Sequence, residues 1–410
     1  MLADSDYLGD DNWTSSWEDD TASPWYCKGF IESAYGRRLQ NDYAISKSDT
    51  LSEIRGRLEI EYTSDSFHLN AKVDALHDDV LKNSKWQPRE LFLSFSPTDR
   101  MDIKAGRQIM TWGTGDYVFL NDLFPKDWQS FFSGRSDEYL KAPSDSLKAS
   151  WFADRFSVNL VWSPKFTPDN TLTGERFSFF SPVADGNIAP DPALNPKEPS
   201  GGTWSARLTT SYQDIEYVFY GYKGYWTMPL GINNQGRMIY PKMNSFGASL
   251  RTAVGKGLLS SEFSWYDSQE DRKGSDLNIP NSQLRWLLGY EQEVVANLTA
   301  SVQYYLESTQ NYAALKENSP HPQYLPTQHR QLLTLRLSWL TLQQKLIWSI
   351  FTFWSPSDRD AYLKPSITYR VNDNWSVATG ANIFCGNEKY TFFGQHENNS
   401  NAWIRVRFSY

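Results

Sequence analysis

The final stretch of the chain, 399–410, alternates between apolar and polar side chains. One phase holds Ala402, Ile404, Val406, Phe408 and Tyr410, and the other holds Trp403, Arg405, Arg407 and Ser409. Successive side chains of a β-strand point to opposite faces, so this spacing predicts a strand with one apolar and one polar side. A soluble fold rarely ends in such a strand, because it leaves an edge and an apolar face exposed. A closed barrel in a bilayer accommodates it, with the apolar side toward lipid.

The same alternation recurs along almost the whole chain and is strongest in 54–62 and 67–75. Weaker segments of this period lie at 25–38, 88–97, 101–112, 145–153, 155–164, 203–212, 214–226, 243–253, 257–267, 282–294, 297–308, 330–340, 343–354, 360–370, 374–386 and 399–410. Together they predict about eighteen strands. Their lengths are close to the roughly 9–11 residues that a tilted strand needs to cross a bilayer. A count of about sixteen stays open if two weak segments are misread.

The connections between these segments alternate between short and long. Short ones fall near 64–65, 97–99, 154, 213, 255–256, 296, 341–342 and 372–374. Long ones fall near 39–50, 80–87, 113–144, 165–202, 227–242, 268–281, 309–329 and 387–398, and only 355–359 is of intermediate length. Outer-membrane barrels have short periplasmic turns and longer external loops. We therefore expect an all-β transmembrane antiparallel barrel over 25–410, in a bacterial outer membrane and with both termini periplasmic.

Residues 1–24 do not alternate and are rich in aspartate and glutamate. We interpret them as an acidic periplasmic N-terminal segment; a segment that docks a periplasmic protein or plugs the barrel is the alternative. The chain carries a net charge of -8, which argues against nucleic-acid binding. A soluble β-helix or propeller is the alternative fold, but no repeat of fixed length or blade signature is present.

The last residues, with Phe408 and Tyr410, resemble the C-terminal assembly signal of Gram-negative outer-membrane β-barrel proteins. That family usually has Phe in the final position, so Tyr410 is a less common variant. The resemblance implies that the barrel assembly machinery inserts the chain. It also implies contact with outer-membrane lipids and lipopolysaccharide.

The polar phase of the predicted strands contains more basic than acidic residues. The basic set is Arg55, Arg57, Lys72, Lys104, Lys148, Arg207, Arg251, Arg285, Arg336, Lys345, Lys364, Arg370, Arg405 and Arg407. The acidic set is Glu59, Glu61, Asp74, Glu90, Asp102, Glu216, Glu262 and Glu291. Charges that line a narrow pore decide which solutes enter, so this excess favours a pathway for neutral or anionic solutes. Cross-strand ion pairs that stiffen the wall are the equally weighted alternative.

The third long connection, 113–144, is too aromatic for a solvated loop. We predict that it folds into the barrel and narrows it, with Trp112, Asp116, Asp122, Lys126, Asp127 and Arg135 at the constriction. The run Gly-Arg-Gln…Trp-Gly-x-x-Asp, followed by Asn-x-x-x-Pro-x-Asp, resembles a poorly characterised group of proteobacterial outer-membrane barrel proteins. That resemblance implies a similar internal loop. A loop folded onto the rim for stability alone is the alternative.

The sequence contains no motif of a catalytic or metal site. None of the histidines lies in a His-Glu-x-x-His pattern, and His77, followed by Asp78 and Asp79, has no nucleophile beside it in sequence. The acidic loop 267–276 lacks the spacing of a calcium loop. We therefore predict no enzyme, no metal and no cofactor.

The predicted function is an outer-membrane channel for small hydrophilic, neutral or anionic solutes. The alternative is a barrel that serves as the sleeve of a trans-envelope complex, such as an electron conduit or a machine for lipid or polysaccharide export. A sleeve needs a periplasmic protein partner, which the acidic segment would dock. Deletion of 1–24 separates the two, because a simple pore keeps conducting without it.

Overall fold

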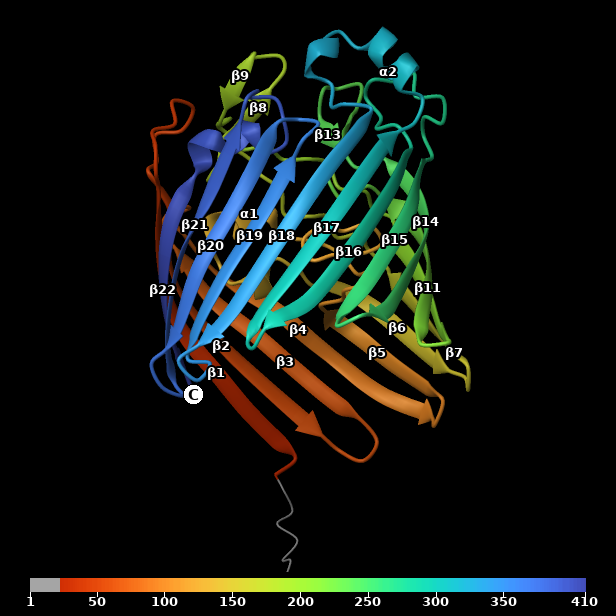
Figure 1. Cartoon of the computed structure of the whole chain (residues 1–410), viewed down its shortest axis with the longest axis vertical. Coiled ribbons are helices and arrows are strands. Elements are labelled where there is room, and N and C mark those ends of the chain that lie inside the picture. Colours follow the sequence, from red (N-terminus) through yellow and green to blue (C-terminus); the bar gives the residue numbers. More distant parts are fainter. Residues whose placement is uncertain (1–22) are drawn as a thin grey trace, which may run out of the picture.

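The structure is a computed structural model that describes residues 23–410, so most of the acidic segment predicted at 1–24 lies outside the described residues. Eighteen strands form one antiparallel sheet. Each barrel strand pairs with the next one along the chain, and the last pairs with the first, which closes the sheet into a barrel (Figure 1). This confirms the predicted fold class and strand count.

The barrel strands keep close to the ranges predicted from the alternation. They are β1 (Trp25–Arg38), β2 (Asp49–Thr63), β3 (His68–Asp78), β4 (Asn83–Thr98), β5 (Met101–Gln108), β6 (Ser144–Phe152), β7 (Phe156–Ser163), β10 (Thr203–Tyr212), β11 (Ile215–Tyr225), β14 (Lys242–Val254), β15 (Gly257–Ser268), β16 (Gln283–Val295), β17 (Leu298–Thr309), β18 (His329–Thr341), β19 (Leu346–Ser355), β20 (Asp360–Arg370), β21 (Trp375–Gly386) and β22 (Asn401–Ser409).

The loops carry the remaining elements. They are α1 (Trp128–Ser133), η1 (Asp137–Tyr139), β8 (Phe179–Ser181), β9 (Gly186–Ile188), β12 (Gly231–Ile232), β13 (Met238–Ile239), α2 (Tyr312–Asn318), η2 (Pro322–Tyr324) and η3 (Gly394–Asn399). Within 23–410, no helix has the length and apolarity needed to cross a membrane.

The alternation separates an apolar outer face from a polar lumen, as predicted. On β2, Ile54 and Leu58 are 58% and 44% exposed, whereas Arg55 and Arg57 between them are 2% and 7% exposed. The C-terminal strand follows the same rule, because Ile404 faces outward and Trp403 is buried. Apolar side chains on the outside and buried charges inside are the reverse of a soluble barrel and fit a lipid-facing wall.

Strand closure joins the two ends of the described chain. The backbone N–H of Gly29 donates to the carbonyl of Tyr410, and the N–H of Tyr410 donates to the carbonyl of Gly29, both at 3.0 Å. Phe408 pairs with Ile31 in the same register. The two residues of the predicted assembly signal therefore lie at the seam where β22 meets β1.

Short turns connect the strands at one end of the barrel, here called the turn end, and most of the long connections lie at the opposite end, the loop end (Figure 1). The prediction of a long connection at 80–87 is wrong. Residues Asn83–Gln87 pair with Asp74–Asp78, so only 79–82 turn. Residues 83–85 are polar and exposed on both faces of the strand, so the segment lacks the apolar phase by which a lipid-facing strand is recognised.

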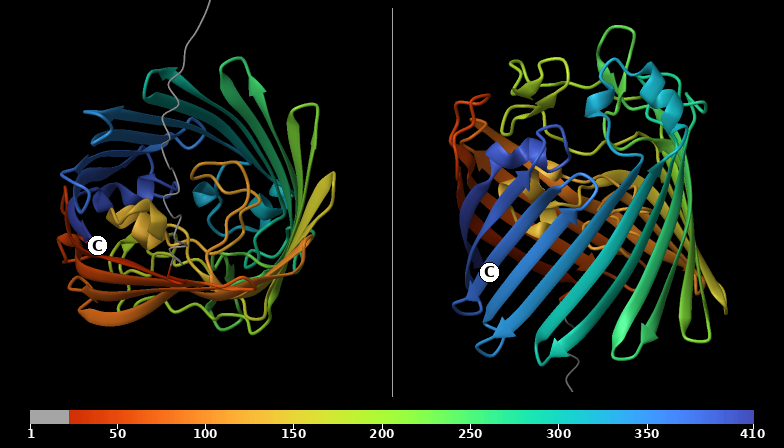
Figure 2. Two further views of the ribbon diagram at one scale, coloured as in Figure 1. Left: turned by 90° about the horizontal axis from the view of Figure 1, so that it is seen from below. Right: turned by 45° about the horizontal axis from the view of Figure 1, so that its top comes forward.

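The strand predicted at 101–112 ends at Gln108, where the chain leaves the wall. Residues 109–143, here called the crossing loop, enter the lumen and carry α1 and η1 (Figure 2). The largest apolar cluster of the described residues joins this loop to the wall, with Phe131 and Phe132 packed among Tyr362, Phe384 and other residues of the barrel.

Candidate functional site

The crossing loop is shaped by local signals around α1. The carboxylate of Asp127 accepts a hydrogen bond from the backbone N–H of Ser130 at 2.8 Å and so caps the helix N-terminus. Gly134 ends the helix in the left-handed region, with φ 89°. A Cβ at Gly134 would overlap the indole ring of Trp403 on β22. The loop therefore turns against the barrel wall at a position where only glycine fits.

Aromatic packing fixes the loop to the wall formed by β19, β20 and β21. Phe131 and Phe132 each contact Tyr362 edge-on, with ring centroids 5.7 Å apart. Phe132 also packs on Phe384 at 5.2 Å, and Tyr117 packs on Phe351 at 4.6 Å. The aromatic content of the loop predicted that it is buried. Burial of several aromatic side chains stabilises the attachment of this face of the loop to the wall.

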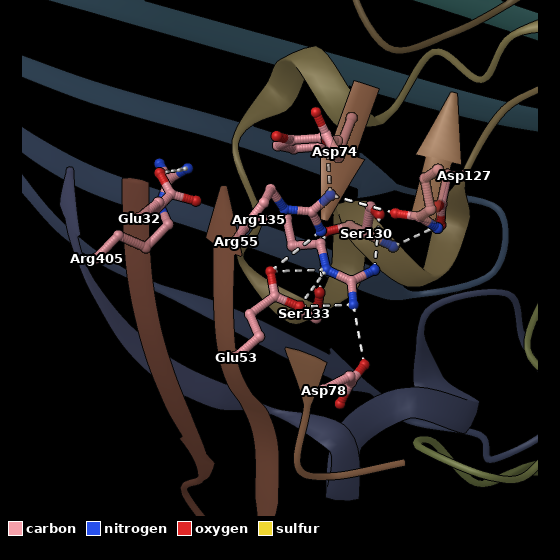
Figure 3. Close-up of polar contacts among 12 residues, drawn as sticks. Glu32, Glu53, Arg55, Asp74, Asp78, Asp127, Ser130, Ser133, Arg135 and Arg405 are labelled. Carbon is pink, nitrogen blue, oxygen red and sulfur yellow. Dashed lines mark hydrogen bonds and ion pairs between the residues drawn. The ribbon is translucent and has the colours of Figure 1, made fainter. Parts of the chain in front are cut away.

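Buried ion pairs fix the loop to the facing wall, formed by β2 and β3 (Figure 3). Arg135 contacts Glu53 at 2.8 Å and Asp78 at 3.2 Å, and all three side chains are at most 8% exposed. Arg176, from the connection between β7 and β10, also pairs with Asp78. Charges buried this deeply are tolerated only when they are paired, so the loop and these two strands depend on one another.

A second set of ion pairs holds η1. The carboxylate of Glu138 contacts Arg57 at 2.5 Å and Arg407 at 3.0 Å, and Asp137 pairs with Lys364. Burial by itself raises the pKa of the Glu138 carboxyl, but Arg57 and Arg407 outweigh it and hold that pKa below its ordinary value. Burial also raises the pKa of the Asp137 carboxyl, but the charge of Lys364 outweighs it, so the pKa of Asp137 lies below its ordinary value.

The start of the loop is tied to a third part of the wall. Glu262 on β15 accepts hydrogen bonds from the backbone N–H groups of Thr114 and Asn121 at 2.7 and 2.9 Å. Asp116 pairs with Arg336 on β18 at 3.1 Å, and burial raises the pKa of the Asp116 carboxyl. The crossing loop is thus attached on several sides and spans the lumen rather than lying along its rim.

The predicted constriction residues divide into two kinds. Asp116 and Arg135 reach the barrel wall. The others hold the loop together: Lys126 pairs with Asp122 at 3.0 Å, Asp127 caps α1, and Trp112 packs on Phe124 at 4.9 Å. The sequence patterns did not single out Glu53 and Asp78, which bind the loop from the wall, or Glu138, which binds the wall from the loop. Only the presence of Arg135 in an aromatic loop pointed toward a buried acidic partner.

The basic residues predicted to line the lumen also divide into two kinds. Ion pairs within about 4 Å involve Arg55, Arg57, Lys72, Arg285, Arg336, Lys364, Arg405 and Arg407. Among residues 23–410, no ion pair is present for Lys345 and Arg370, which lie at the turn end, nor for Lys104, Lys148, Arg207 or Arg251. The last four belong to β5, β6, β10 and β14, which with β7 and β11 form one continuous part of the wall, and Lys104 lies directly across from Lys148. Cross-strand pairing thus explains the first set and not the second.

Two cavities flank the crossing loop. The larger, of about 720 Å³, lies between the loop, the β15–β19 side of the wall and the connections of the loop end, and its lining includes Trp128, Arg285, Glu307 and Arg330. The smaller, of about 180 Å³, lies toward β3 and β4 and is lined by Arg55, Arg89 and Arg135, among others. In the described part of the chain, no group of three or more His, Cys, Asp or Glu side chains has the arrangement of a metal site.

Comparison with solved structures shows the same architecture. OccAB4 of Acinetobacter baumannii aligns with a TM-score of 0.58 at 10% identity, over 95% of this chain and 98% of that one. OccD3 (OpdP) of Pseudomonas aeruginosa aligns with a TM-score of 0.56 at 10% identity, over 94% and 90%. OccAB3 of A. baumannii aligns with a TM-score of 0.55 at 7% identity, over 94% and 99%. At this identity the likeness shows the fold alone, a closed antiparallel barrel.

No protein-family model matches the chain, and no curated protein does. The resemblance of the crossing-loop motif to a proteobacterial group therefore stays a prediction, whereas the predicted closed antiparallel barrel is confirmed.

Proposed function

We propose that the protein is an outer-membrane channel for small hydrophilic solutes, neutral or anionic, with the turn end and both termini in the periplasm. The observation that carries this proposal is the wall formed by Lys104, Lys148, Arg207 and Arg251, whose charges have no carboxylate within ion-pair distance in the described residues. In that part of the chain, the same strands carry two carboxylates without an ion pair, Asp102 and Glu216, and Glu216 lies directly across from Arg251, so the four cations leave a net positive charge. A net positive charge in a narrow, low-dielectric lumen attracts anions and disfavours cations.

The crossing loop supports a channel over a sleeve. A sleeve holds a partner chain inside its lumen, and that path here is occupied by the protein's own loop, which is tied to β2, β15, β18 and β20. A loop fixed on facing walls narrows the lumen to the spaces beside it, which suits passage of small solutes.

Single-channel conductance in a planar bilayer, with the reversal potential measured under a KCl gradient, tests this proposal. We expect stable open steps with anion preference. The variant K104Q/K148Q/R207Q/R251Q keeps the conductance steps and loses the preference. Its matched control removes the same charge from exposed loop lysines, K82Q/K165Q/K273Q/K316Q, and retains the preference. A folded barrel that does not conduct, or one that prefers cations, overturns the proposal.

A further inference from the structure

The larger cavity beside the crossing loop differs in chemistry from the wall of unpaired cations. Its volume of about 720 Å³ falls within the roughly 300–1,000 Å³ typical of sites for small organic ligands. Connections of the loop end contribute to its lining, together with the crossing loop and the wall. A solute that enters from the loop end therefore meets this cavity at the level where the crossing loop narrows the lumen.

Aromatic rings line the cavity from several directions. Trp128 and Phe131 come from the crossing loop, Tyr266 and Phe353 from the wall, and Phe392 from the connection before β22. Phe131 and Phe353 are in edge contact at 6.5 Å, so the two sides meet. Phe131, Tyr266 and Phe353 are almost fully buried, and Arg285 stacks over the Tyr266 ring, so the accessible aromatic surface comes from Trp128 and Phe392. Such flat apolar surface packs against the C–H face of a ring-shaped ligand.

Two ion pairs of the cavity lining lie on its β16–β19 side. Arg285 contacts Glu307 at 3.3 Å and Arg330 contacts Asp358 at 2.8 Å. Glu307 also accepts a hydrogen bond from the Tyr305 hydroxyl at 2.6 Å. The row of charges alternates in sign along β16, β17, β18 and the turn that follows β19, so it offers donors and acceptors side by side without an excess of either charge.

The carboxylate on the opposite side of the cavity is also satisfied. Asp169 accepts hydrogen bonds from the Trp128 indole at 3.0 Å and the Thr227 hydroxyl at 3.1 Å. Two enclosed donors on lining residues, Nη2 of Arg330 and Nε1 of Trp226, have no hydrogen-bond partner in the part of the chain that the structure describes. Both atoms are enclosed by protein, so a ligand can bond to them only after the surrounding side chains move.

We infer that this cavity binds neutral sugars, with the ring packed on aromatic faces and the hydroxyls bonded to the paired Arg and Glu or Asp side chains. The lining carries five acidic and four basic side chains, so it gives an anion no Coulomb attraction to offset its loss of hydration. A sugar brings alternating donors and acceptors, which match the alternating row, and an apolar face, which matches the rings. The inference rests on the proposed channel function and adds to it a substrate class.

Titration calorimetry of the folded protein in detergent, with maltotriose and raffinose as neutral probes and gluconate as the anionic comparison, tests the site. We expect saturable binding of at least one neutral probe that is tighter than binding of gluconate. The charge-neutral variant R330Q/D358N weakens it about tenfold or more, the effect of losing hydrogen bonds to charged groups. W226F weakens it less, and W86F, at an outward-facing tryptophan that is 78% exposed, leaves it unchanged.

The same probes added to an open channel in a planar bilayer separate this inference from the channel proposal. Interruption of the current by a neutral sugar at the concentrations that bind supports both. A conducting channel that binds neither sugar, or that binds gluconate more tightly, overturns the sugar site and leaves the channel. Sugar binding to a barrel that never conducts overturns the channel and leaves the site.

Discussion

Arg135 in the crossing loop donates hydrogen bonds from its Nε to both carboxylate oxygens of Glu53 on strand β2, at 3.2 and 2.9 Å. The two residues are 82 positions apart in the chain, and both are buried. Asp78 on β3 joins the same guanidinium. One side chain of the crossing loop thus connects the loop to two neighbouring strands of the wall.

Replacement of Arg135 by alanine leaves Glu53 and Asp78 with fewer cationic partners in a buried site. Breaking a buried pair costs about 3–5 kcal/mol, and the lower end applies here because Arg55 and Arg176 remain. We expect R135A to lower the free energy of unfolding of the barrel by about 3 kcal/mol, measured by urea titration in lipid vesicles. Arg37 faces outward and is exposed, so R37A serves as the control. Equal stability of the two variants would contradict the assigned role.

Gly134 combines left-handed backbone with close contact to Trp403. Alanine at this position has to push the indole or the loop aside, so we predict that G134A displaces the crossing loop and raises the single-channel conductance. Gly236 has a similar φ of +76° with open space around its Cβ direction. G236A therefore carries the backbone strain without the clash, and its conductance stays at the wild-type value. If both variants behave alike, the contact with Trp403 is irrelevant to the pore.

Acidification is expected to loosen the crossing loop. The Glu138 and Asp137 carboxyls have lowered pKa values in the folded protein, so their contribution to stability is complete above their ordinary pKa of about 4 and declines as the pH falls below it. We predict noisier current steps as the pH is lowered from 5 toward 3, and no such change between pH 6 and 8. E138Q shows part of this noise already at pH 7. A transition that appears on raising the pH would contradict the sign of this linkage.

Gly29 receives the C-terminal aromatic at the barrel seam. A Cβ there would overlap the backbone carbonyl of Arg57 on β2 and lie 2.6 Å from the Tyr410 hydroxyl oxygen. We therefore predict that G29V reduces the fraction of chains that close into a heat-modifiable barrel. Gly56 on β2 has no atom within 4 Å of the corresponding position, so G56V is a matched control that assembles normally.

The ring at the chain end provides a second test of the seam. Tyr410 is 56% exposed, and its backbone bonds to Gly29 do not depend on the hydroxyl. Y410F should therefore assemble like the wild type, while removal of Tyr410 lowers assembly. Normal assembly of the truncated chain in cells would show that the terminal aromatic is not part of the signal.

The fold could be predicted because each wall strand reports its own environment. In 54–62 the side chains alternate between lipid and lumen, and that alternation requires no knowledge of the partner strand. The exception is 80–87, which is strand from Asn83 onward. Residues 83–85 are polar on both faces of the strand, so no apolar phase marks the segment as part of the wall.

The crossing loop could be predicted only in part, for a related reason. Its aromatic content indicated burial, and two of the predicted constriction residues, Arg135 and Asp116, reach the wall. Their partners lie far away in sequence, and pairing between distant residues leaves no local pattern. The lumen charges pose the same problem: Arg57 and Arg207 look alike in their strands, yet Arg57 pairs with Asp74 and Arg207 has no ion pair in the described residues.

The most direct test of the whole account compares the single-channel conductance of the wild type with that of a variant in which a short Gly-Ser linker replaces residues 114–140. Heat-modifiable mobility first shows that both barrels are folded. We predict that both conduct and that the unitary conductance of the variant is several times larger, because the loop fixed between facing walls is the main restriction. Equal conductance, or two folded barrels that do not conduct, would contradict the account.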